Sequence, residues 1–204
     1  TSTDPAWTVV VGPSGGGKSE FINMLSLFKW TPPGENQQQQ FVTPVSTLTA
    51  RTFVSGFKAA GKDPSLLTQV TRGIITIKDM TSLLSEHKDD KAVIMGQLRE
   101  IYDGKYNKKF GNGEEVNWNG KITVIAAATY AIHSMKAQYV AMGERFLFYN
   151  LIQPDREGAA ERTMENQEDG KMAEHRQHFA EMFAALAVDV LNSIPKEIPK
   201  MNKG

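Results

Sequence analysis

A glycine-rich segment near the start of the chain constrains the fold more than any other feature. Residues 12–19 read GPSGGGKS and match the pattern G-x-x-x-x-G-K-[ST], between a β-branched run at Thr8–Val11 and a helical pattern. Loops of this kind turn backbone N–H groups around a phosphate, while the lysine reaches the β- and γ-phosphates and the serine hydroxyl ligates Mg²⁺. A helix that starts at the loop also points the positive end of its dipole at the anion. The segment predicts a nucleoside triphosphate site with ATP and Mg²⁺ as ligands.

The predicted ligand contacts all fall within this loop or next to it. Lys18 is expected to bind the phosphates and to take part in catalysis, and Ser19 is expected to ligate Mg²⁺. The alternative is a glycine-rich turn that matches by accident, but the strand before it and the helix after it favour the phosphate site. The residues expected to contact the nucleotide are Gly12, Pro13, Ser14, Gly15, Gly16, Gly17, Lys18, Ser19 and Glu20.

The composition is that of an ordinary globular protein, and it limits the other function classes. The chain has 204 residues, enough for one α/β domain with a sizeable core, and its formal net charge is zero. A neutral chain has no global attraction to nucleic acid, so any such contact must come from a local cluster. The absence of cysteine excludes disulfides and thiol catalysis, and it suits a cytoplasmic protein. The sequence contains no membrane-spanning run and no signal peptide, and its start at Thr1 without Met favours a domain of a longer protein.

Short apolar strands alternate with helical patterns along most of the chain. This alternation predicts an α/β fold of the P-loop NTPase type, in which helices cover both faces of a parallel sheet. Pro44 favours an edge position for the second strand. Residues 1–155 are expected to form the ATPase core with a β-hairpin at about 105–118, and residues 156–204 a helical lid and basic tail. Strands are expected at residues 8–12, 41–48, 74–79, 121–129 and 145–152, helices at 18–29, 49–60, 90–102 and 132–142, and a surface loop at 31–40.

Asp79 ends the predicted strand ITIKD and is the first candidate for a catalytic carboxylate. A nucleotide hydrolase needs such a group at the tip of a neighbouring strand, near Mg²⁺ and its water shell. The alternative is a carboxylate that caps the helix beginning at Thr81. The next residue is Met80, where many ATPases carry a glutamate that orients the attacking water. Asp79 itself is one candidate for that task, and the others are Glu86, Glu100 and Asp103.

Two further candidates flank the last predicted strands. Thr129 ends the strand KITVIAAAT, where its hydroxyl is placed either to bond the γ-phosphate or attacking water, or to cap the following helix. Arg145 lies between a helix and a strand, far in sequence from the phosphate loop. It is badly placed for its own nucleotide but well placed to reach a site across a subunit interface, where a guanidinium stabilises phosphoryl charge. A surface salt bridge with Glu144 is the alternative.

The predicted hairpin carries a local basic cluster. Lys105, Lys108 and Lys109 alternate with Tyr106 and Phe110. Basic residues between aromatic ones grip the backbone of single-stranded nucleic acid and stack on its bases. The alternative is a solvated hairpin whose aromatic side chains pack on the domain.

The order of these motifs resembles an AAA+ ATPase. A Walker A loop (GPSGGGKS) is followed by a Walker B-like strand (ITIKD), a hairpin, a sensor-1-like strand tip at Thr129 and an arginine motif (GERF). The hairpin resembles the pre-sensor-1 insertion of superfamily 3 and MCM-type helicases, in which it points into a central pore, and GERF resembles the MCM arginine finger. The stretch from KDMTSLLS to MGERF is also similar to ATPase domains of phage and mobile-element replication proteins. Arg156 and Arg162 are the candidates for a sensor-2 arginine.

This resemblance implies a motor that hydrolyses ATP in a ring, with a hexamer as the expected assembly. It implies a replicative helicase or helicase-like ATPase that acts on single-stranded or forked DNA, with Arg145 completing the site of a neighbour. A P-loop kinase of a nucleotide or small molecule is the first alternative, since it needs no oligomer. A nucleotide-dependent scaffold without hydrolysis is the second, because Met80 stands where a catalytic glutamate is expected.

Overall fold

The computed structural model describes residues 4–31, 36, 39–55, 65–141, 145–152 and 171–193. Its centre is a five-stranded sheet in the order β4-β5-β8-β1-β9, and every pair in that sheet is parallel. The α/β class predicted from the alternating pattern is therefore confirmed. Pro44 lies in an edge strand, as expected. The strands are β1 (Trp7–Val11), β4 (Val42–Val45), β5 (Arg72–Ile77), β8 (Lys121–Ala128) and β9 (Phe146–Asn150).

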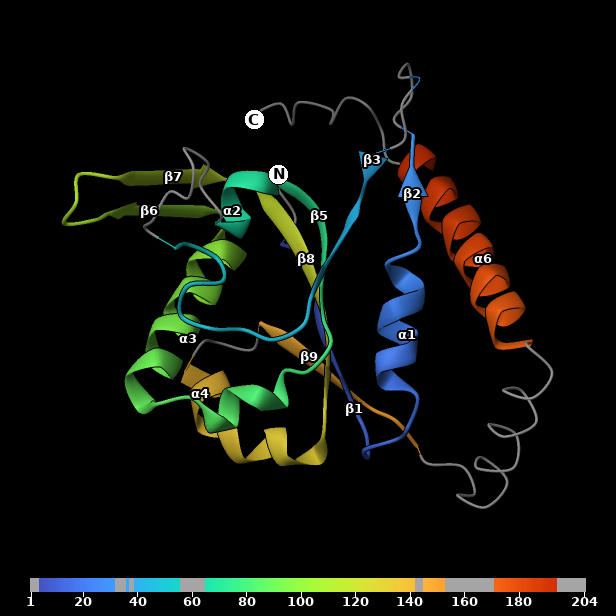
Figure 1. Ribbon diagram of the computed structural model, residues 1–204, viewed down its shortest axis with the longest axis horizontal. Coiled ribbons are helices and arrows are strands. Elements are labelled where there is room, and N and C mark those ends of the chain that lie inside the picture. The colour runs from blue at the N-terminus through green and yellow to red at the C-terminus, as the bar shows by residue number, and fades with distance from the viewer. Residues whose placement is uncertain are drawn as a thin grey trace, which may run out of the picture.

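Helices cover both faces of this sheet (Figure 1). One layer contains α1 (Lys18–Leu25) and α6 (Lys171–Ser193), and the other contains α3 (Lys88–Asp103) and α4 (Lys136–Ala141). Buried strands between two helical layers explain the nearly continuous apolar runs in β1, β5 and β8. Within the described part of the chain, no helix combines the length and apolar character needed to cross a membrane.

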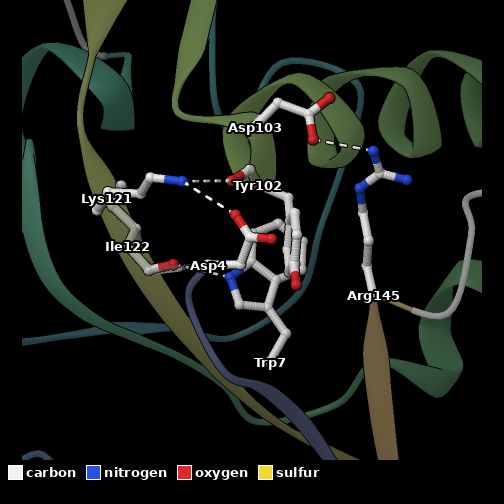
Figure 2. Close-up of polar contacts among 7 residues, drawn as sticks. All are labelled: Asp4, Trp7, Tyr102, Asp103, Lys121, Ile122 and Arg145. Carbon is white, nitrogen blue, oxygen red and sulfur yellow. Dashed lines mark hydrogen bonds and ion pairs between the residues drawn. The ribbon is translucent and has the colours of Figure 1, made fainter. Parts of the chain in front are cut away.

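Trp7 anchors the core at the amino end of the sheet (Figure 2). The Trp7 side chain is fully buried, and its Nε1 donates a hydrogen bond of 2.7 Å to the Ile122 carbonyl of β8. The ring centroids of Tyr102 and Phe146 each lie 5.2 Å from that of Trp7. This contact ties β1, β8, β9 and the end of α3 together at one point.

The long helix α6 docks on α1, the helix that follows the glycine-rich loop. Phe179 meets Phe21 at 5.7 Å between ring centroids, and Phe183 meets Phe28 at 5.4 Å. Arg176 forms an ion pair with Glu20 in the first turn of α1. Two parts of the predicted lid and tail, residues 156–170 and 194–204, lie outside the described residues, and the first includes Arg156 and Arg162.

The sequence prediction failed for several short segments. Residues 49–55 form turns rather than the start of the helix predicted for 49–60, and residues 56–60 lie outside the described part. Thr52 Oγ1 accepts a hydrogen bond of 2.9 Å from the Thr49 N–H, an example of a hydroxyl that competes with helical bonding. The helix predicted for 18–29 ends at Leu25, and the end of the predicted loop 31–40 instead pairs as β3 (Gln39–Gln40) with β2 (Lys29–Trp30).

The predicted hairpin is confirmed as β6 (Lys105–Lys109) and β7 (Glu115–Asn119), which pair antiparallel and project from the body of the domain. The loop that joins the two strands contains residues 111–113 (Gly-Asn-Gly). The last of these, Gly113, adopts a left-handed conformation (φ 85°) that favours glycine.

Gly120 joins β7 to β8 at a place where a side chain has no room. A Cβ atom there would lie 2.3 Å from the Thr71 carbonyl oxygen and 2.4 Å from the Trp118 ring. Trp118 is buried, and its Nε1 donates a hydrogen bond of 2.9 Å to the Val70 carbonyl, so moving its ring aside would cost free energy. We expect Gly120→Ala to lower the free energy of unfolding, measured in urea, by about 2–3 kcal/mol.

The matched control is Gly96→Ala in α3, where a Cβ atom meets nothing within 4 Å. That change is expected to raise the free energy of unfolding by about 0.5–1 kcal/mol, because alanine favours the helix more than glycine does. Equal stability of Gly120→Ala and the wild type would contradict the packing described here.

Candidate nucleotide-binding site

The glycine-rich loop leaves the carboxyl end of the central strand β1. The Gly12 N–H donates 3.1 Å to the Ala128 carbonyl, and the Gly16 N–H donates 3.2 Å to the Pro13 carbonyl. Gly15 and Gly17 have φ near +76° and +75°, a region that favours glycine, and a Cβ atom on either would meet nothing within 4 Å. The loop therefore curls into a turn whose left-handed positions face open space.

Apart from the N–H groups of Gly12 and Gly16, the backbone N–H groups of this loop have no hydrogen-bond partners among the described residues. None of those residues accepts a hydrogen bond from the N–H groups of Ser14, Gly15, Gly17, Lys18, Ser19 or Glu20. Gly17 is the N-cap of α1, so no side chain caps this helix. Uncapped N–H groups at the positive end of a helix form a site for an anion such as phosphate.

Lys18 lies over the loop rather than in open solvent. Lys18 is only 9% exposed, and its Nζ donates a hydrogen bond to the Pro13 carbonyl. Burial lowers the pKa of Lys18 from its usual value, and the negative charge of Asp79 opposes that shift. The charge of Asp79 is thus felt at Lys18, while their membership of one nucleotide site stays a prediction.

Asp79 follows β5 at the same end of the sheet, and one of its two carboxylate oxygens is used within the chain. Its Oδ1 accepts a hydrogen bond of 2.9 Å from the N–H of Thr81, the first residue of the short 3-10 helix η1 (Thr81–Ser85), whose N-cap residue is Met80. Its Oδ2 has no hydrogen-bond partner among the described residues. The hydrogen bond to η1 and the predicted metal ligation are thus compatible.

Thr129 ends β8, the strand that separates β5 from the loop strand β1. It does not cap the next helix, η2 (Tyr130–Met135), with its side chain. Instead the Thr129 N–H donates 2.7 Å to Thr81 Oγ1, and the two hydroxyls lie 3.3 Å apart. The sheet therefore brings the loop, Thr129 and Asp79 to neighbouring strand ends.

Thr81 is a site residue that the sequence prediction missed. It receives the hydrogen bond of the Thr129 backbone and gives its own N–H to Asp79, so it joins the two strand tips. The spacing D-x-T is a signal that would have found it, because an aspartate often accepts a hydrogen bond from the N–H two residues later.

Met80 has a structural role that explains why a glutamate is missing there. Its side chain is fully buried in the core, and its N–H donates 2.8 Å to the Ala127 carbonyl of β8. A carboxylate at this position would point into apolar surroundings instead of toward the loop.

The other carboxylates named as candidates for water activation lie in different places. Helix α3 starts after η1, near the loop end of the sheet, and finishes at Asp103, beside the amino end of β9. Glu100 and Asp103 are thus at the far end of α3 and are not brought to the loop. Glu86 follows η1 directly and remains on the loop side.

The oxygen groups present fit a Mg²⁺ ion held jointly with a nucleotide. Asp79 Oδ2 and the Ser19 hydroxyl are hard oxygen donors of the kind that Mg²⁺ prefers. No three His, Asp or Glu side chains of the described ranges gather into a metal cluster. A Mg²⁺ ion at this place would take its remaining ligands from phosphate oxygens and water.

Arg145 is separated from the rest of the candidate site. It precedes β9, and Phe146 is in register with Trp7 at the amino end of β1, whereas the loop follows Val11. Four strand residues span about 13 Å, so Arg145 belongs to the opposite edge of the sheet. Arg145 therefore lies away from the glycine-rich loop of its own chain.

The Arg145 side chain is held by α3 (Figure 2). One guanidinium nitrogen lies 2.9 Å from Asp103 Oδ1, and the guanidinium carbon lies 5.2 Å from the centre of the Tyr102 ring. Its Nε is buried and has no partner in the described part of the chain. Glu144, the predicted alternative partner, lies outside that part.

The hairpin presents its lysines on two faces. Lys105 and Lys109 lie on the exposed face, and Lys109 pairs with Glu115 at 3.7 Å. Tyr106, on the other face, is buried in the core, and Phe110 packs against the core below the Lys108 ammonium group, 5.0 Å from its ring centre. The aromatic residues therefore fix the hairpin to the domain, and Lys105 and Lys109 face solvent, whereas Lys108 is half-buried.

Comparison with protein-family models and with curated proteins gave no match for this chain.

Proposed function

We propose that this protein is an ATPase whose site is the loop between β1 and α1. The observation that carries the proposal is the set of unpartnered backbone N–H groups around Lys18, next to Asp79 and Thr129 on neighbouring strand tips. Backbone donors, a lysine and a carboxylate are the parts needed for phosphoryl transfer, which depends mainly on positioning and electrostatics.

In this proposal the chain's own residues divide the work. The loop N–H groups and Lys18 bind the β- and γ-phosphates, and Ser19 and Asp79 hold Mg²⁺, which neutralises charge on the phosphates. Thr129 orients the attacking water through its hydroxyl. The water oxygen bonds to the γ-phosphorus as the bond from that phosphorus to the β–γ bridging oxygen breaks. ADP leaves with the electron pair of that bond, and the proton lost by the water passes to an oxygen of the new phosphate.

We further propose that the protein works as a ring-forming motor, of the AAA+ type that its motif order resembles. The position of Arg145 supports this, because an arginine at the edge opposite to the loop can meet a nucleotide only in another subunit. Assembly would require Arg145 to exchange its contact with Asp103 for the neighbour's phosphate. The exposed lysines of the hairpin support single-stranded DNA as the substrate track.

A nucleotide-dependent scaffold without hydrolysis is the second candidate. The buried Met80 favours it, since the segment that follows β5 (residues 78–80) has no glutamate to activate water. A kinase of a nucleotide or small molecule is not favoured by any particular contact of the described residues.

The first test separates binding from hydrolysis. Lys18→Ala is expected to weaken ATP binding and abolish phosphate release, because the phosphate charge loses its lysine. Asp79→Asn keeps its shape and should bind ATP nearly as well, but lose at least about a hundredfold in turnover. Phosphate release and calorimetric titration measure both. Wild-type turnover in Lys18→Ala would remove the assignment of the loop, and binding without turnover in the wild type would favour the scaffold.

The second test asks whether Arg145 acts on a neighbour. Arg145→Ala should still bind ATP, while hydrolysis falls by about 10³–10⁵ if the guanidinium is an arginine finger. Mixing it with Lys18→Ala should restore part of the activity, since one interface then combines an intact loop with an intact arginine. Asp103→Asn is the matched control, because it breaks the same ion pair but keeps the arginine. Equal loss in Arg145→Ala and Asp103→Asn would mean that the pair is only structural.

The third test concerns DNA. Replacing Lys105 and Lys109 together by alanine should weaken binding of a single-stranded oligonucleotide and reduce the salt slope by up to about 1.4, at roughly 0.7 per lost phosphate contact. The control replaces Lys88 and Lys136, two exposed lysines outside the hairpin. An unchanged slope in the hairpin variant would exclude the hairpin as the DNA contact.

A further inference from the structure

A cavity of about 280 Å³ opens directly beside the candidate phosphate site. One wall is the loop itself, with Gly16, Gly17 and Lys18. The rest of the lining is mainly apolar and consists of Val10 from β1, Phe21 from α1, and Tyr149 and Leu151 from β9 and the residues after it. Because the same cavity touches loop and β9, a molecule bound in the loop has this space as its nearest extension.

Asp79 and Thr129 both lie on the side of the loop away from β9. β1 is hydrogen-bonded to β8 on one side and to β9 on the other. Thr129 and Asp79 follow the strands on the β8 side, while Leu151 follows β9 and donates its N–H 2.7 Å to the Val11 carbonyl. The γ-phosphate must face Thr129 and Asp79, so the nucleoside leaves the loop toward β9.

Tyr149 is the aromatic residue that β9 contributes to this lining. Its side chain is 62% exposed, so its ring is accessible from solvent. An exposed aromatic ring next to a polyphosphate site offers a flat surface on which a nucleobase can stack.

We propose that Tyr149, with Phe21 and Leu151, forms the base-binding platform of the site, and that the preferred ligand is a purine nucleotide. This inference rests on the proposed nucleotide function of the loop. The preference follows from area, since a purine covers more of an aromatic surface than a pyrimidine does, and stacking needs no particular base edge.

The experiment compares three probes, Mg·ATP, Mg·CTP and Mg·tripolyphosphate, by calorimetric titration. Tripolyphosphate reports the loop alone, because it has no base. Wild-type protein should bind ATP more tightly than CTP. Tyr149→Ala should weaken ATP about tenfold and leave tripolyphosphate unchanged, which also shows that the variant is folded.

Two matched variants complete the test. Tyr149→Phe keeps the ring and should bind ATP like the wild type. Leu147→Ala changes a side chain of equal exposure on the same strand that does not line the cavity, and it should have no effect. ATP affinity that is unchanged in Tyr149→Ala, or reduced equally for tripolyphosphate, would overturn the base platform alone. Failure of wild-type protein to bind either ATP or tripolyphosphate would overturn the proposed function itself.

Discussion

The candidate site depends on the hydrogen bonding of β1 on both of its sides. Pairing with β8 and β9 fixes the end of β1, and the Gly12 N–H extends the ladder to Ala128 before the chain turns away. The glycines that follow then turn without a side-chain cap, so the first N–H groups of α1 have no partners among the described residues. Ser14, Gly15, Gly16, Gly17 and Ser19 are exposed, so these N–H groups are accessible to an anion.

Local sequence patterns were sufficient for the parts of the site that each lie within one element. The strand–loop–helix pattern located Lys18 and Ser19, and the strand ends located Asp79 and Thr129, because parallel strands end at a common edge. The patterns could not supply contacts between elements. The bond from Thr129 to Thr81 and the pair of Arg145 with Asp103 join residues 48 and 42 positions apart, and no local period encodes them.

Burial also decided positions where residue type alone misled. Met80 stands where many ATPases carry a catalytic glutamate, but its side chain is fully buried in the core. The residue just before η1 therefore serves packing. Tyr106 read as a base-stacking residue of the hairpin, yet it is buried and burial raises the pKa of its hydroxyl. In both places a tertiary contact outweighed a motif-based interpretation.

Phe21 has contacts on two sides, and this links distant parts of the chain. Its ring meets Phe179 of α6, and its side chain lines the cavity beside the loop. Glu20, the preceding residue, holds Arg176 of the same helix. Suppose that a ligand in this cavity changes the equilibrium constant for α6 docking by some factor. By thermodynamic linkage, docking of α6 then changes the affinity for that ligand by the same factor. A ligand in that cavity and helix α6 would therefore meet on the same side chain, that of Phe21.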